Sequence, residues 1–117
     1  MLRAIEATQV FGEADALALL GGDRELLRSL TRLFLELSPL MLGDLTVSFA
    51  RGDADKVVRV ARRLEASASQ ICAPAAAATA RRLALTVHAD GLAGAEPMVK
   101  QLSKDLSLLH RRLRDEL

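Results

Sequence analysis

The sequence predicts an all-α protein, an up-and-down antiparallel four-helix bundle preceded by one short helix. Half of the 117 residues are hydrophobic but only 3% are aromatic, and a chain poor in β-branched and aromatic residues favours helices over sheets. Apolar residues recur at spacings of three and four in several long stretches, as on one face of a helix. The connections between these stretches are short, so consecutive helices should be antiparallel neighbours. The length predicts one domain, residues 1–117.

The first two helices are predicted over residues 13–20 and 24–50. Gly21-Gly22 between them suits a left-handed helix exit, and Asp23 is expected to cap the second helix. Pro39 should kink that helix near Glu36 without breaking it. The predicted core stripe of the second helix consists of Leu26, Leu30, Leu33, Leu37, Leu40 or Met41, Leu45 and Phe49.

Three more helices follow, each with one apolar stripe. Gly52-Asp53 should end the second helix and cap the third, Pro74 should open the fourth in the first turn, and the fifth should start within residues 94–97. The stripe of the third helix is predicted to be Val57, Ala61, Leu64, Ala68 and Ile71. Those of the last two helices are Ala76, Ala80, Leu83 and Val87, then Met98 or Val99, Leu102, Leu106, Leu109 and Leu113.

Composition excludes several classes of function. A net charge of +1 gives no electrostatic footprint for DNA, and without Trp or Tyr base stacking on single strands is disfavoured. The lone Cys72 rules out an internal disulfide or a cysteine-based zinc site, and it is expected to be a small buried hydrophobe. No signal segment or uninterrupted apolar span of membrane length is present. We expect a soluble, cytoplasmic protein that binds neither nucleic acid nor membrane and needs no cofactor or metal.

A series of short motifs carries a resemblance across nearly the whole chain. They are Phe11-Gly12-Glu13-Ala14-Asp15-Ala16-Leu17, Leu20-Gly21-Gly22-Asp23, Leu26-Leu27, Phe34-Leu35, Pro39-Leu40, Gly52-Asp53, Leu64, Ser67-Ala68 and Ala73-Pro74. In this order and spacing the chain resembles the histidine-containing phosphotransfer (HPt) domains of bacterial two-component phosphorelays. The resemblance implies a helical bundle whose partner is a receiver domain or a histidine kinase.

The phosphotransfer motif of that family is altered in this chain. Family members carry a His-x-Leu-Lys-Gly-Ser-Ala type sequence on the third helix, in which the histidine carries the phosphoryl group, the lysine steadies it and the glycine makes room for the partner. Laid on this chain, these three positions hold Arg62, Glu65 and Ala66. A guanidinium stays protonated and is no nucleophile, and a carboxylate at the lysine position repels phosphate.

Helical periodicity places Arg62 outward, about 140° from Val57, together with Arg59, Ala66 and Ser69. One interpretation is a solvated surface, with Arg62 and Glu65 in an intrahelical ion pair worth roughly 0.2–0.5 kcal/mol. The other interpretation is a surface that still docks the partner but no longer carries a phosphoryl group. The predicted partner-binding residues are Arg59, Arg62, Glu65, Ala66 and Ser69.

The sequence therefore predicts a non-phosphorylatable HPt-like adaptor, not an enzyme, that is a monomer or weak dimer and binds a receiver domain or histidine kinase. The alternative is a structural, self-associating bundle unrelated to phosphorelays, with an outer apolar patch that includes Val47, Leu85 and Leu108. A third, less favoured hypothesis is phosphotransfer through His88 or His110, which are both expected to be partly exposed and incidental.

Overall fold

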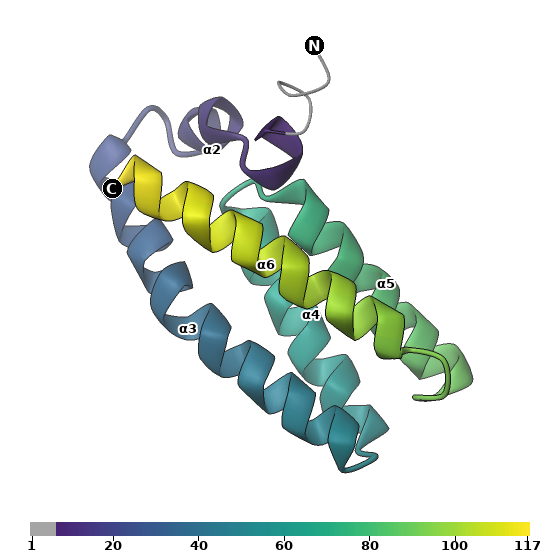
Figure 1. The fold of residues 1–117 in the computed structure, drawn as a ribbon. Coiled ribbons are helices and arrows are strands. Elements are labelled where there is room, and N and C mark those ends of the chain that lie inside the picture. Colours follow the sequence, from purple (N-terminus) through teal and green to yellow (C-terminus); the bar gives the residue numbers. More distant parts are fainter. Residues whose placement is uncertain (1–6) are drawn as a thin grey trace.

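The computed structural model describes residues 7–117, which form helices and no strand (Figure 1). The helices are α2 (Glu13–Leu19), α3 (Arg24–Ala50), α4 (Ala54–Gln70), α5 (Pro74–Asp90) and α6 (Glu96–Glu116). Residues 7–10 are also helical, a segment that the sequence analysis did not predict. The observed bounds lie within a residue or two of the predicted ones, and the all-helical fold class is confirmed.

Four long helices alternate in direction, and α2 crosses one end of the bundle (Figure 1). The predicted helix starts are confirmed: Asp23 Oδ1 accepts a hydrogen bond from the backbone N–H of Leu26 at 3.0 Å, and Asp53 Oδ1 accepts one from Lys56 at 3.1 Å. Such caps satisfy backbone donors that have no partner within the helix. Pro74 opens α5, where its missing N–H removes no hydrogen bond.

The core stripes of α4, α5 and α6 are the predicted ones. Every predicted α4 stripe residue is at most 2% exposed, and the same holds from Leu102 to Leu113 on α6. Alanines in α4 and α5 let these two helices approach closely, and they form the most extensive helix pair of the bundle. Because the apolar stripe of α4 is buried in the bundle, the opposite side of α4 points to solvent.

The predicted core stripe of α3 is wrong over its first half. Four of its leucines are exposed to solvent by 42–67%: Leu26, Leu33, Leu37 and Leu40. The buried line of α3 instead consists of Leu27, Thr31, Phe34, Ser38, Leu45 and Ser48. The helix is therefore turned so that part of its core face is polar and its leucine stripe lies to one side of the core.

Buried polar groups on this line are tolerated because they have partners. Ser38 Oγ lies 2.6 Å from His110 Nε2 of α6, and the His110 ring packs edge-on against Phe34, with ring centroids 6.0 Å apart. Within the described residues, no buried side-chain nitrogen or oxygen lacks a hydrogen-bond partner. Burying a hydroxyl in such a bond avoids the cost of an unsatisfied polar group.

α3 contains a proline and is strongly apolar. The helix runs through Pro39 without a break. By length and composition α3 is also apolar enough to cross a membrane, although only 22% of its most apolar stretch is buried in the bundle. Core helices of soluble proteins share this composition, and in α3 much of the apolar surface comes from the exposed leucines.

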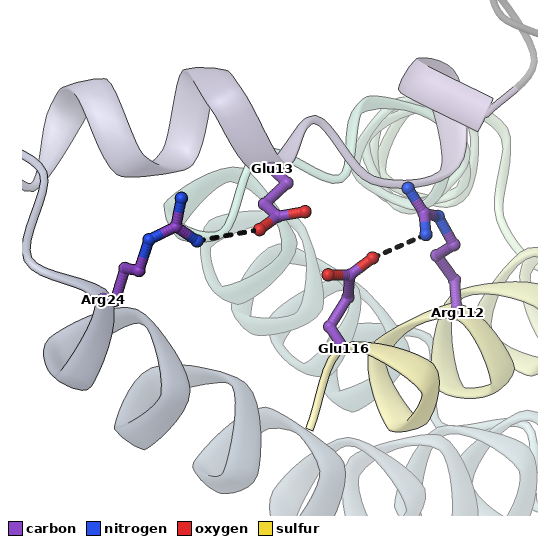
Figure 2. Close-up of polar contacts among 4 residues, drawn as sticks. All are labelled: Glu13, Arg24, Arg112 and Glu116. Carbon is purple, nitrogen blue, oxygen red and sulfur yellow. Dashed lines mark hydrogen bonds and ion pairs between the residues drawn. The ribbon is translucent and has the colours of Figure 1, made fainter.

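The end of the bundle that carries α2 is held by polar contacts (Figure 2). Arg24 Nη1 lies 3.4 Å from Glu13 Oε1, and Arg112 Nη1 donates to Glu116 Oε1 at 2.6 Å. The Gly12 N–H donates to the Cys72 carbonyl at 2.7 Å, which fastens the start of α2 to the end of α4. The Gly12–Cys72 hydrogen bond and the Arg24–Glu13 pair thus tie α2 to the end of α4 and to α3, whereas the Arg112–Glu116 pair lies within α6.

Candidate functional site

The five predicted partner-binding residues lie on the solvent side of α4, opposite its buried stripe. Arg59, Arg62, Ala66 and Ser69 are exposed and Glu65 is half-buried. From residue 59 to residue 69 the face extends about 15 Å along the helix axis, at 1.5 Å per residue. We call these five residues the α4 face.

The predicted ion pair between Arg62 and Glu65 is absent. Among residues 7–117 neither side chain forms an ion pair or a side-chain hydrogen bond. Both sit on a helix surface where two flexible chains gain little by pairing in water. The guanidinium of Arg62 is therefore a solvent-exposed cation with no partner in the described part of the chain.

One half of the α4 face opens into a shallow depression of about 460 Å³. Glu65 and Ser69 line it from α4, Asp15 from α2, and Arg81 from α5. Its floor is made of small side chains at the start of α5, including Pro74, Ala77 and Ala78. The sequence pattern alone does not predict Asp15 on this surface, because only the position of α2 brings it there.

The other half of the α4 face borders a second hollow. Arg59 lines it together with Asp55 of α4 and His88 of α5. Arg62 and Ala66 line neither hollow and lie on the ridge between them. Three of the five predicted residues therefore line hollows shared with α2 or α5, and the other two lie on the ridge. The five form one strip rather than one pocket.

Exposed arginines outnumber carboxylates on α4 and α5. Five arginines of α4 and α5 are exposed: Arg59, Arg62, Arg63, Arg81 and Arg82. None of them forms an ion pair within residues 7–117. Asp15, Asp55 and Glu65 are fewer and lie in the flanking hollows. The overall charge is nearly balanced, but this local surface favours an acidic partner.

The two histidines differ in their surroundings. His88 is exposed at the end of α5, near Arg59. His110 is half-buried against α3, and burial, followed by the positive charge of Arg114, lowers the pKa of its imidazole. Its Nε2 is occupied by Ser38, so His110 serves the α3–α6 contact and was wrongly expected to be incidental.

Cys72 lies in the turn after α4 with a left-handed backbone, φ 56°. Burial, and then the negative charge of Asp15, raises the pKa of its thiol. A raised pKa lowers the share of thiolate, the nucleophilic form. The side chain is half-buried, less than expected, and lines the depression beside Asp15. Across residues 7–117 no group of three His, Cys, Asp or Glu side chains is placed to hold a metal ion.

Comparison with known proteins identifies the fold. No protein-family model matches the sequence, and no curated protein matches it either. The structure is similar to the crystal structure of the HPT domain from the Hpt sensor hybrid histidine kinase of Shewanella, with a TM-score of 0.85 and 11% sequence identity over 94% of this chain and 95% of that one. This chain has the fold of a histidine-containing phosphotransfer domain.

Proposed function

We propose that this protein is an HPt-like adaptor that docks a receiver domain, or a histidine kinase, through the α4 face and does not carry a phosphoryl group. The observation behind this proposal is the exposed, unpaired Arg62 at the position of the family's histidine, on an intact HPt fold. The proposal makes the protein a binding module and not an enzyme.

The chemistry of the α4 face opposes phosphotransfer. A phosphorelay histidine must offer a neutral ring nitrogen to the phosphorus atom, whereas the guanidinium of Arg62 stays protonated and has no free lone pair to attack with. Glu65 adds a negative charge one turn away, which disfavours an incoming phosphoryl group. His110 does not replace the missing nucleophile, since it lies on α6 and is bonded to Ser38. His88 lines the second hollow with Arg59 and lies off the ridge that holds Arg62.

The same features suit docking. By the family resemblance, the partner offers a pocket of acidic residues around its phosphorylated aspartate. Arg62 presents five N–H donors in a planar fork, a geometry that matches carboxylates. Ala66 keeps the ridge low beside it, and the exposed arginines of α5 extend the positive surface. A permanent cation would then occupy the place where a phosphohistidine forms transiently.

A binding assay with a panel of receiver domains tests the proposal. Calorimetry with wild-type protein and with Arg62→Ala should show at least about a tenfold loss of affinity for the cognate receiver, the size expected when a central arginine contact is removed. Arg111→Ala, which removes another exposed arginine, on α6, is the matched control and should bind as wild type does. Equal losses in the two variants, or none in either, would refute a contact through Arg62.

A phosphate-transfer assay tests the second half of the proposal. Wild-type protein incubated with phosphorylated receivers and with autophosphorylating kinases should acquire no label. Label on the wild-type protein would show that it is a phosphotransfer carrier, and His88→Gln and His110→Gln would then locate the phosphoryl group.

A further inference from the structure

The exposed leucines of α3 follow a regular repeat. Their positions are Leu26, Leu30, Leu33, Leu37 and Leu40, at alternating spacings of four and three. Four of them are 42–67% exposed and Leu30 is half-buried. An average spacing of 3.5 residues is the heptad repeat, which forms a narrow straight seam along a helix that pairs with another helix. We call these five residues the leucine seam.

The core of the protein does not account for the leucine seam. α3 already packs against α4 and α6 through a different line of side chains, centred on Leu27, Phe34 and Leu45. The exposed leucines form one contiguous row that the core does not use, and such a row offers an apolar surface to a partner. Other exposed leucines include Leu85 on α5 and Leu108 on α6, which do not belong to this repeat.

We propose that the leucine seam binds the leucine seam of a second copy of this chain, with the two α3 helices antiparallel. The repeat is nearly symmetric about Leu33, so a two-fold axis there pairs Leu26 with Leu40 and Leu30 with Leu37 of the other copy. Every leucine then contacts a leucine, the self-complementary arrangement that a two-fold interface requires.

The charge at the end of the leucine seam disfavours a parallel pair. Asp44 occupies the next position of the repeat, and a parallel pair would set it against Asp44 of the second copy. In the antiparallel register Asp44 lies opposite the start of the other α3, near the exposed Arg24. There the helix N-terminus and Arg24 attract the carboxylate and the capping Asp23 repels it, while the antiparallel pair avoids the direct repulsion between two Asp44 side chains.

The size of the leucine seam predicts a weak dimer. The exposed fractions of its four exposed leucines together amount to roughly two whole leucine residues. That apolar area lies well below the roughly 800 Å² per partner of a standard interface. A shallow groove between α3 and α4, lined by Leu30, Met41 and Gln70 among others, adds a side wall. We expect self-association in the micromolar to millimolar range.

Sedimentation equilibrium over a wide concentration range tests this proposal without any partner protein, so its outcome is independent of receiver binding. Wild type should dimerise, and Leu33→Glu/Leu37→Glu should stay monomeric over the same range. The matched control is Leu85→Glu/Leu108→Glu, whose leucines are as exposed, at 47% and 49%, and it should dimerise as wild type does. Circular dichroism should show that both double variants are folded.

Cysteine crosslinking tests the orientation. In a Cys72→Gly background, mixing Leu26→Cys with Leu40→Cys protein should give the mixed disulfide dimer in excess over either like dimer. A wild type that remains monomeric at millimolar concentration overturns the proposal, as does a dimer lost equally in both glutamate variants. Crosslinking of Leu26→Cys only to itself overturns the antiparallel arrangement. A monomeric wild type whose receiver binding is lost in Leu33→Glu/Leu37→Glu would assign the leucine seam to that partner instead.

Discussion

α3 and α4 lie side by side and have opposite relations between sequence pattern and surface. In α4 the apolar stripe is buried and the exposed side is polar, with arginines along its ridge. In α3 the most regular apolar stripe is exposed, while serines and a threonine share the buried line. A helix with one apolar stripe packs that stripe against the core. A helix with two apolar lines packs one against the core and leaves the other exposed for a partner. The comparison predicts different consequences for the same substitution in the two helices.

The largest difference should appear when one leucine of each helix is shortened. Leu64→Ala, at 1% exposure in α4, should lower the free energy of unfolding by about 2–5 kcal/mol, because it removes buried methyl groups and leaves a cavity. Leu33→Ala, at 49% exposure in α3, should cost less than about 1 kcal/mol. Urea unfolding at low protein concentration measures both, and equal losses would mean that Leu33 is a core residue after all.

The sequence predicted α4, α5 and α6 well because each has a single apolar stripe, and that stripe is the core. It failed on α3 because the leucine seam is more regular than the line that is buried. Ser38 is buried only because His110 accepts or donates a hydrogen bond from α6, and a pairing 72 residues away in sequence leaves no local periodic signal. Thr31 and Ser48 are also polar and buried, so apolar periodicity does not mark the buried line of α3 at these positions either.

The candidate site was predictable in part. Outward placement of Arg62 follows from the α4 stripe alone, and the structure agrees. The contributions of Asp15 and Arg81 to the depression depend on how α2 and α5 pack beside α4, which spacing along one helix does not encode. The predicted pair between Arg62 and Glu65 failed because proximity on a helix permits an ion pair without requiring one.

A smaller effect should separate the two histidines by pH. Since the pKa of His110 is lowered in the folded state from 6.5, the unfolded chain binds the proton more readily. Its contribution to stability is therefore full above about pH 6.5 and is lost as the pH falls through the lower folded value. Denaturant unfolding between about pH 7.5 and 5.5 should show this loss in wild type.

The matched variants for that measurement are His110→Gln and His88→Gln. The first should flatten the pH dependence, and the second should leave it unchanged because His88 is exposed. An identical pH dependence in wild type and His110→Gln would contradict the Ser38–His110 contact as the link between α3 and α6.

The smallest expected effect concerns two neighbouring carboxylates, Glu13 at the start of α2 and Glu116 at the end of α6 (Figure 2). Burial, and then the neighbouring Glu13 carboxylate, raises the pKa of Glu116, while Arg112 opposes the shift. A raised folded pKa stabilises the protein below the unfolded value of about 4.5, and this contribution is lost as the pH rises through the folded value. Glu116→Gln should remove that part of the pH dependence of the melting temperature and change neutral-pH stability little, since the lost ion pair with Arg112 is offset by relief from Glu13. A steeper pH dependence in the variant would contradict this.

A decisive experiment restores the phosphotransfer motif, because we propose that the HPt fold and its docking face persist without the reacting groups. The variant Arg62→His/Glu65→Lys/Ala66→Gly should be phosphorylated on residue 62 by a cognate phosphorylated receiver or kinase, whereas wild type should remain unlabelled under the same conditions. A folded triple variant that binds the receiver yet acquires no phosphate would contradict the account, and so would phosphate on the wild-type protein.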